Sequence, residues 1–234
     1  MAAAARAPKG NRLLQALPPK DLDLLKPDLA QSSFKVHQVF ERANRRIDEI
    51  WFPVSGIISV VAEHADGRAE IGIIGCEGMT GTAVVLGSDR SPHETYVQLS
   101  GAGYRLPVAK LRQAMAKSPS LHGLLTKFTQ AFLVQTAHTA IANARATLVE
   151  RLARWLLMAH DRVADQRLAL THEFLSLMLA VRRAGVTEAL HDLEGRKLIA
   201  AGRREITLRD RGGIAKIAGE FYGTPEAEYR RLFK

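Results

Sequence analysis

Two neighbouring segments between positions 170 and 199 carry apolar residues at helical spacing. In the first, Thr171 is a candidate N-cap and Glu173 stands in the first turn, which predicts a short amphipathic helix. The second follows a break at residues 180–183 and has apolar side chains at i, i+3, i+4 and i+7, which predicts one buried face. These apolar positions are Val186, Ala189, Leu190 and Leu193. The pattern predicts a helix-turn-helix.

Polar side chains on the other face of the second predicted helix are candidates for reading DNA. In a helix-turn-helix, the first helix crosses the DNA backbone and the N-terminal half of the second lies in the major groove. An arginine there can bind guanine O6 and N7 together or hold a phosphate, and a bidentate pair contributes about 1 to 3 kcal/mol of discrimination. Glu188 can accept a hydrogen bond from cytosine N4 or repel the phosphates, and both interpretations stay open. The candidate residues are Arg182, Arg183, Thr187, Glu188 and His191, with Thr171 on the first helix.

A short hairpin, or wing, is predicted directly after the second helix. Residues 200–210 read AAGRREITLRD, in which Gly202 can turn the chain and positions 205–208 alternate polar and apolar residues as a half-buried strand does. The basic residues around this hairpin are Arg196, Lys197, Arg203, Arg204, Arg209 and Arg211. Beside a helix-turn-helix, such side chains can contact phosphates on either side of the second helix. We therefore add Lys197, Arg203 and Arg204 to the candidate DNA-binding residues.

Short β-rich runs replace the helical pattern from residue 34 to residue 110. They are IDEIWFPV, GIISVVAEH, AEIGIIG, TYVQLSG and GYRLPV, and turn residues separate them. This spacing predicts a small all-β barrel or roll. Glycine recurs at every third position from Gly72 to Gly81, and glycine-rich loops can bring backbone N–H groups to a phosphate. Because no GK[ST] sequence follows, we expect these glycines to serve tight turns between strands.

A long helix is predicted from Pro119, with Ser118 as its N-cap. Its heptad a and d positions are apolar at both ends and polar in the middle. The expected seam contains Leu121, Leu124, Phe128, Gln135, His138 and Ala142. This pattern predicts a parallel coiled-coil dimer interface, and the alternative is a helix that packs on its own β-domain. A second amphipathic helix is predicted over residues 147–163.

The composition favours a polyanionic partner. The chain has 234 residues, of which 47% are hydrophobic, and a formal net charge of +9. It has no apolar run of the roughly 20 residues that a membrane span needs, and its first residues lack a signal-peptide core, so we expect a cytoplasmic protein with no membrane partner and a disordered segment at 1–12. Cys76 is a lone cysteine, which excludes an internal disulfide. No GxSxG, HExxH or clustered-carboxylate pattern occurs, which disfavours an enzyme.

The order of β-roll, long helix and winged helix-turn-helix resembles the Crp/Fnr family of bacterial transcription regulators over nearly the whole chain. LTHEFLSLMLAVRRAGVTEALHDLEGRKLI is similar to the family's C-terminal pattern, and WFPVSGIISVV with IGIIGCEGMTG is similar to its cyclic-nucleotide-binding-type roll. The resemblance implies an α+β fold with an effector β-roll of double-stranded β-helix or jelly-roll type at 13–117, a dimerisation helix at 118–146 and a winged helix-turn-helix at 147–234. It further implies a homodimer on a pseudo-palindromic double-stranded DNA site with half-sites ~34 Å apart, and it makes RNA polymerase a candidate partner.

The expected effector pocket departs from the cyclic-AMP-binding members of the family. Where those members carry a Glu and, further along, an Arg that pairs with the cyclic phosphate, this chain has Thr82 and Pro92. A buried phosphate without its arginine is strongly disfavoured, so cyclic AMP is not expected unless Arg90 takes that place. Thr136 matches a family threonine that touches the nucleotide. The expected pocket for an unidentified small molecule or redox signal thus contains Gly78, Thr82, Arg90 and Thr136.

Other cofactors and the DNA-reading residues also differ from familiar members. An iron–sulfur sensor needs four cysteines and is not expected, no metal site is expected, and a haem would need an axial ligand such as His64, His93 or His138. In the second helix, Arg183 is followed by Ala and then by Glu188, where the family often has an Arg-Glu pair followed by Arg, which predicts a different target sequence. The alternative function is a Crp-like interaction protein without sequence-specific DNA binding. If the chain does bind DNA, we expect the signal sensed by the roll to shift an equilibrium between a DNA-competent and an incompetent dimer. The shift would be transmitted along the seam near Gln135 and His138.

Overall fold

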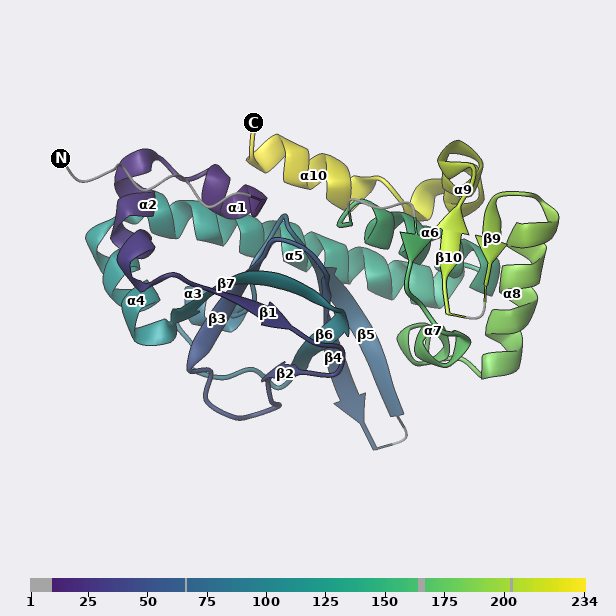
Figure 1. The fold of residues 1–234 in the computed structure, drawn as a ribbon, viewed down its shortest axis with the longest axis horizontal. Helices are drawn as coiled ribbons and strands as arrows, with labels where there is room; N and C mark the ends of the chain where they lie inside the picture. The colour runs from purple at the N-terminus through teal and green to yellow at the C-terminus, as the bar shows by residue number, and fades with distance from the viewer. Residues whose placement is uncertain (1–9, 66, 164–166, 203) are drawn as a thin grey trace.

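Two antiparallel sheets form the N-terminal part of the molecule and share one apolar core (Figure 1). The computed structural model describes residues 10–65, 67–163, 167–202 and 204–234. One sheet has the strand order β1-β7-β3, with β1 at Ala30–Phe34, β7 at Gly101–Pro107 and β3 at Glu49–Pro53. The other has the order β2-β6-β4-β5, with β2 at Val39–Glu41, β6 at Glu94–Leu99, β4 at Ile57–His64 and β5 at Gly67–Ile74. We call this part the roll.

The β-rich runs predicted from the sequence form strands β3 to β7, and the mixed helix-and-sheet fold is confirmed. These runs were readable as short apolar stretches because both faces of β3 and β6 and of the first part of β4 are buried. Strand β1 was not predicted, because its sequence AQSSF is polar and only Phe34 at its end is buried. It joins the sheet through its backbone, pairing with β7 from Ala30 opposite Arg105 to Phe34 opposite Gly101.

Residues 10–12, which were expected to belong to a disordered segment, are part of the ordered structure. Asn11, placed by the sequence analysis in a disordered segment, is fully buried. Its Oδ1 accepts a hydrogen bond from Leu14 N at 2.9 Å, and its Nδ2 donates to the carbonyls of Pro53 and Gly78 at 2.7 and 2.9 Å. Asn11 therefore caps a helix and anchors it to the roll, whereas residues 1–9 lie outside the described residues. The helices at this end are α1 at Arg12–Gln15, α2 at Pro19–Leu25, the 3-10 helix η1 at Lys26–Asp28, α3 at Thr82–Val85 and α4 at Val108–Lys117.

Helix α5, Pro119–Arg145, packs on β5, α3 and α4. It begins as predicted, because Ser118 Oγ accepts a hydrogen bond from Leu121 N at 3.2 Å. Gly72 lets it approach the roll closely, since a Cβ there would lie 2.8 Å from the ring of Phe132. A Cβ on Gly78 would overlap the ring of Phe128 in the same way.

The seam expected to face a partner subunit instead faces the roll. Leu121, Phe128, Gln135 and Ala142 are buried within the protomer. Gln135 shows why: its Oε1 accepts from Ile73 N at 2.7 Å and its Nε2 donates to Ile73 O at 3.2 Å. Leu124 and His138 are half-buried. The alternative interpretation, a helix packed on its own β-domain, is therefore correct for this face, because both interfaces select residues at the same helical spacing.

The C-terminal part continues from α5 and shares a second apolar core with one side of the roll. Residues of β4, β5 and β6, including Val61, Ile73 and Tyr96, join this core. Its elements are α6 at Leu148–His160, β8 at Arg167–Leu168, α7 at His172–Met178, α8 at Arg183–Gly195, β9 at Ile199–Ala201, β10 at Ile206–Leu208, α9 at Arg211–Ala218, the 3-10 helix η2 at Gly219–Phe221 and α10 at Thr224–Leu232. Figure 1 shows α10 returning along α5 towards α1. In the part of the chain that the structure describes, no helix has both the length and the apolar character needed to cross a membrane.

A buried carboxylate connects the roll to α6. Glu70 on β5 accepts hydrogen bonds from Ser59 Oγ at 2.6 Å and from Trp155 Nε1 at 2.7 Å. Burial raises the pKa of the Glu70 carboxyl to about 7, although both hydrogen bonds oppose the shift. Arg154, also on α6, is buried and donates to the Phe221 carbonyl at 3.0 Å. The position of the C-terminal part is therefore set by polar contacts as well as by apolar packing.

Candidate nucleic-acid interface

The predicted helix-turn-helix is formed by α7 and α8. Thr171 caps α7, because its Oγ1 accepts a hydrogen bond from Phe174 N at 3.1 Å. The helix ends at Met178, and Ala180 adopts a left-handed conformation with a φ of 49° before α8 begins at Arg183. The turn therefore lies at the break read from the sequence. The carbonyl of Leu179 accepts a hydrogen bond from Arg151 of α6, which holds the turn against the preceding helix.

Helix α8 separates buried apolar residues from exposed polar ones as predicted. Val186, Ala189, Leu190 and Leu193 all have exposed fractions of 3% or less. On its outer side, the exposed residues include Arg182, Arg183, Glu188 and His191. Within the described residues, these four side chains make no hydrogen bond or ion pair. The outer side of α8 thus presents polar groups that an external partner can bind without breaking an internal contact.

Thr187 differs from its predicted role as an outward-facing residue. It is half-buried, and its Oγ1 lies 3.0 Å from His172 Nδ1. The same hydroxyl donates to the Arg183 carbonyl at 3.2 Å. Thr187 therefore joins α8 to the start of α7, and a base would have to compete with these contacts. His172 was missed because a histidine directly after an N-cap carries no pattern of its own.

The wing is a small sheet with the strand order β8-β10-β9. Strands β9 and β10 pair antiparallel, with Ile206 opposite Ala201 and Leu208 opposite Ile199. Glu194 Oε1 accepts a hydrogen bond from Ala201 N at 2.9 Å, which fastens β9 to α8. This contact was not predicted, because Glu194 is exposed and seven positions separate it from Ala201. A hollow between α7, α8 and the wing is lined by Thr171, His172, Glu173, Arg183, Leu190, His191, Glu194, Ala201, Gly202 and Arg204.

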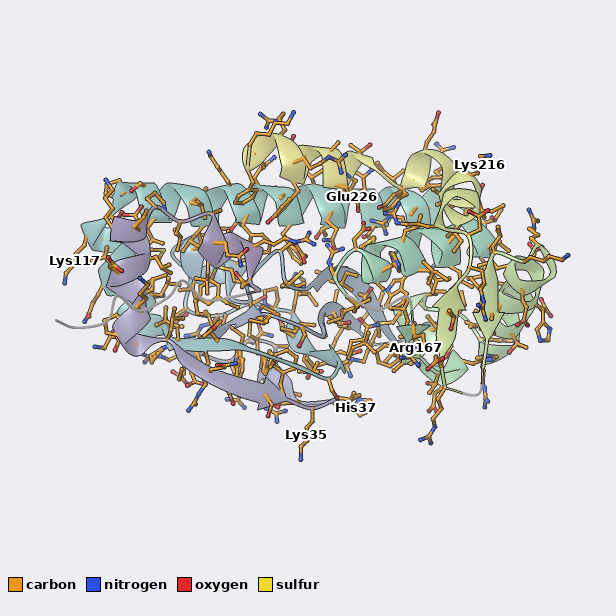
Figure 2. The ribbon with its side chains drawn as sticks, turned by 45° about the horizontal axis from the view of Figure 1, so that its top comes forward. Lys35, His37, Lys117, Arg167, Lys216 and Glu226 are labelled. Carbon is orange, nitrogen blue, oxygen red and sulfur yellow. The ribbon has the colours of Figure 1, made fainter. Side chains whose placement is uncertain are left out.

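The basic residues predicted around the wing divide into two groups. Lys197, Arg204 and Arg209 are exposed near the wing, and Arg203 lies outside the described residues. Arg196 is held by Asp192 through two hydrogen bonds of 2.7 and 3.0 Å. Arg211 points elsewhere: on α9, its guanidinium binds Asp161 at 2.6 Å. The basic surface therefore depends on fewer side chains than the sequence suggested. Lys216, also on α9, extends outward from the molecule (Figure 2).

The four residues of the expected effector pocket do not form one site. Helix α3, which begins at Thr82, packs against α5 near His122, whose Nε2 lies 3.0 Å from Val85 O. Thr136 lies fourteen residues further along α5, about 21 Å at 1.5 Å per residue. Gly78 contacts Phe128 instead, and Arg90 is exposed and paired with Asp89 at 2.9 Å. The resemblance placed these residues together by position in the chain, whereas the packing of the roll on α5 separates them.

The C-terminal geometry agrees with a comparison of the sequence with protein families. Residues 150–217 match a family model described as a Crp-like helix-turn-helix domain. This part of the chain is a Crp-like helix-turn-helix domain. The match begins in α6 and ends in α9, so it includes the helix-turn-helix and the wing. No curated protein sequence matches the chain.

Several solved structures are similar to this one, among them a transcriptional regulator of the Crp/Fnr family. A regulator of the Crp/Fnr family from Eubacterium rectale has a TM-score of 0.68 at 15% identity, over 88% of this chain and 97% of its own. FixK2 from Bradyrhizobium japonicum has a TM-score of 0.69 at 17% identity, over 82% of this chain and 98% of its own. The c-di-GMP-responsive global regulator CLP from Xanthomonas campestris has a TM-score of 0.64 at 16% identity, over 82% and 99%. The chain has the fold of Crp/Fnr transcriptional regulators, with a helix-turn-helix DNA-binding domain, and the resemblance expected from the sequence is confirmed.

Proposed function

We propose that the protein is a homodimeric transcriptional regulator that binds a specific, pseudo-palindromic sequence of double-stranded DNA. The observation that carries this proposal is the outer side of α8, where Arg182 and Arg183 are exposed at the helix N-terminus without partners among the described residues. In a helix-turn-helix, this end of the second helix reaches the base edges. Arginine at that place can bind guanine through two parallel hydrogen bonds.

The wing extends this surface beyond the end of α8. Exposed Lys197 and Arg204 follow α8 in the chain, and arginine and lysine side chains there can hold DNA phosphates beside the major groove. The exposed carboxylate of Glu188 lies among these basic residues. In the proposed complex it faces bases, where it can accept a hydrogen bond from cytosine N4.

The proposed dimer uses the side of α5 opposite the one that packs on the roll. Leu133 and Ile141 are apolar residues with exposed fractions of 62% and 49%, and Ala137 between them is also exposed. Their spacing of four residues places them on one stripe of the helix. Two such stripes packed around a two-fold axis would cover both and would present two copies of α8 about one helical turn of DNA apart. RNA polymerase as a further partner stays a prediction of the resemblance.

The test of sequence-specific binding is selection of bound duplexes from a random DNA pool at one fixed salt concentration. We expect the wild-type protein to enrich an inverted repeat and Arg183→Ala to lose or relax that preference. The matched control is Arg45→Ala, which removes an exposed arginine from the roll and should leave the consensus unchanged. If no sequence is enriched and binding to bulk DNA is insensitive to salt, the proposal is wrong and the interaction-protein alternative is favoured.

The dimer is tested separately with the double variant Leu133→Asp and Ile141→Asp. Two carboxylates on the exposed stripe should prevent its burial against a second copy without disturbing the buried side of α5. We expect a monomer by sedimentation where the wild type is a dimer, with an unchanged circular dichroism spectrum. Gln113→Asp, which adds a carboxylate at an exposed position of α4, away from this stripe, serves as the control. An unchanged oligomeric state in the double variant would exclude this interface.

A further inference from the structure

A cleft of about 330 Å³ lies where the roll, α5 and the C-terminal helices meet. Phe128, Ala131 and Phe132 of α5 form an apolar part of its lining, and Tyr222 and Tyr229 add two aromatic rings. Helix α10 covers one side, because Tyr229 packs against the core of the roll and its hydroxyl donates to Glu77 O at 2.8 Å. Figure 2 shows Glu226, another residue of the lining, near the start of α10.

The acidic side chains in this cleft are already bound. Glu77 Oε1 accepts from Arg162 Nε at 2.8 Å, and both side chains are about nine-tenths buried. The Asp161 carboxylate accepts from Arg211 and from the Tyr222 hydroxyl, each at 2.6 Å. These contacts satisfy the two carboxylates with partners from neighbouring elements.

The carboxylate of Glu226 is hydrogen-bonded to the protein backbone rather than to a basic side chain. Its Oε2 accepts a hydrogen bond from Gly223 N at 3.0 Å, which closes the N-terminus of α10. Together with the two pairs, this contact leaves the acidic groups of the lining with internal partners. A cation entering the cleft would therefore have to displace an existing contact.

Two arginines in the lining have no such partner. The side chains of Arg12 and Arg230 are exposed and make no hydrogen bond or ion pair within the described ranges 10–65, 67–163, 167–202 and 204–234. Arg12 is held in place by its backbone, whose N–H donates to Cys76 O at 2.6 Å. Arg230 belongs to α10, so the two guanidiniums come from different parts of the molecule. The uncommitted charge of the cleft is positive.

We propose that this cleft binds a small anionic ligand with an aromatic or other flat apolar body, which contacts Arg12 and Arg230 through its negative group. The volume is near the lower end of the about 300 to 1,000 Å³ that small-molecule sites occupy. Arginine guanidiniums match carboxylate, sulfonate and phosphate geometry, and the phenylalanine and tyrosine rings provide apolar contact for the body. None of Gly78, Thr82, Arg90 and Thr136 lines the cleft, so this site is separate from the pocket expected from the sequence.

The interpretation of this cleft as an effector site rests on the proposed regulatory function. A ligand that contacts both Arg12 and Arg230 stabilises the arrangement in which α10 lies along α5. Because α10 follows the helix-turn-helix domain in the chain, such a ligand favours one position of α8 relative to the roll. The ligand then changes the affinity of the protein for DNA, and DNA changes the affinity for the ligand by the same factor.

The binding site can be tested on the full chain without DNA, so its failure does not depend on the regulatory function. The probe is anilinonaphthalenesulfonate, an aromatic anion whose fluorescence rises on binding, compared with N-phenylnaphthylamine, which has the same rings without the sulfonate. We expect saturable binding of one anionic probe per protomer, at least about tenfold tighter than the neutral one, since charge-assisted hydrogen bonds contribute that much.

Two arginine variants locate the probe. Arg12→Gln and Arg230→Gln should each weaken the anionic probe about tenfold and leave the neutral one unchanged. The control is Arg231→Gln, the neighbouring position on α10, where the guanidinium is bound to Glu228 and does not line the cleft. Equal binding of both probes, a non-saturable signal, or an affinity that neither cleft variant changes would each overturn the proposal. All three positions are exposed, so we expect unchanged folding by circular dichroism.

Discussion

The outer side of α8 and the junction between the roll and α6 both carry charged residues, but these residues differ in burial and in hydrogen bonding. On α8, Arg182 and Arg183 are exposed and have no partner within the described part of the chain. At the junction, Glu70 and Arg154 are buried and each makes several polar contacts. Both sets lie close to the same helix-turn-helix.

The difference follows from the cost of removing a charge from water. A buried charged or polar group must find its partners inside the protein, which specifies how the roll and the C-terminal part are arranged. An exposed arginine keeps its hydration until an external anion replaces water. The junction thus sets the position of α8, whereas the outer side of α8 is available for a partner.

The outer side of α8 should bind DNA with a strong dependence on salt. If its basic residues and those of the wing hold six or more phosphates, the affinity for the selected duplex falls by about 10³-fold or more between about 50 and 200 mM salt, because bound counterions are released. Fluorescence anisotropy titrations at several salt concentrations give the slope. A flat dependence would contradict a role for this surface in phosphate binding.

The junction should make stability depend on pH through Glu70. Its pKa is raised from 4.5 to about 7, so the stability contributed by the protonated carboxyl is present below pH 4.5 and is lost as the pH rises through 7. Relative to Glu70→Gln, the wild type should lose about 3 kcal/mol of unfolding free energy over this range. Denaturant unfolding on both sides of the range measures it. Exposed Glu220→Gln is the control, and parallel pH profiles of wild type and Glu70→Gln would contradict the assignment.

The packing of α5 on the roll should depend on the two hydrogen bonds between Gln135 and Ile73. Gln135→Leu removes both hydrogen bonds to Ile73 and leaves a buried N–H and C=O without partners, which should lower the unfolding free energy by about 2 kcal/mol. Gln113→Leu makes the same change at an exposed position of α4 and should have little effect. Thermal unfolding distinguishes the two. Equal stabilities would mean that Gln135 does not fasten α5 to the roll.

Thr187 lies on α8, but its hydroxyl is held by contacts inside the protein. Its replacement should therefore change stability and DNA affinity only slightly. Thr187→Ala loses the contact with His172 and should cost about 1 kcal/mol of stability. Because the hydroxyl is already engaged, the DNA affinity should change by less than about tenfold. The control is Thr126→Ala, which removes a similar hydroxyl-to-carbonyl bond on α5. A larger loss of DNA affinity at unchanged stability would assign Thr187 to base contact instead.

Much of the fold could be predicted because α6 and α8 are amphipathic with a helical period and the main strands of the roll are short apolar runs. The buried row from Val186 to Leu193 and the capping roles of Ser118 and Thr171 depend on residues within one helix. Polar β1 was missed, because backbone pairing leaves no hydrophobic pattern. Arg211 was assigned to the wing by its place in the sequence, whereas its partner Asp161 is fifty residues away.

The amino-acid sequence was enough to predict the local structure of this protein: most strands of the roll, the long helix and the winged helix-turn-helix. These elements follow from periodicity and capping, which act over a few residues. Three relations are visible only in the folded molecule: the face of α5 that packs on the roll, the contact of Thr187 with His172, and the cleft that Arg12 and Arg230 both line. These relations join residues of different elements, so they depend on how side chains fill the space between the elements rather than on the pattern within any one of them.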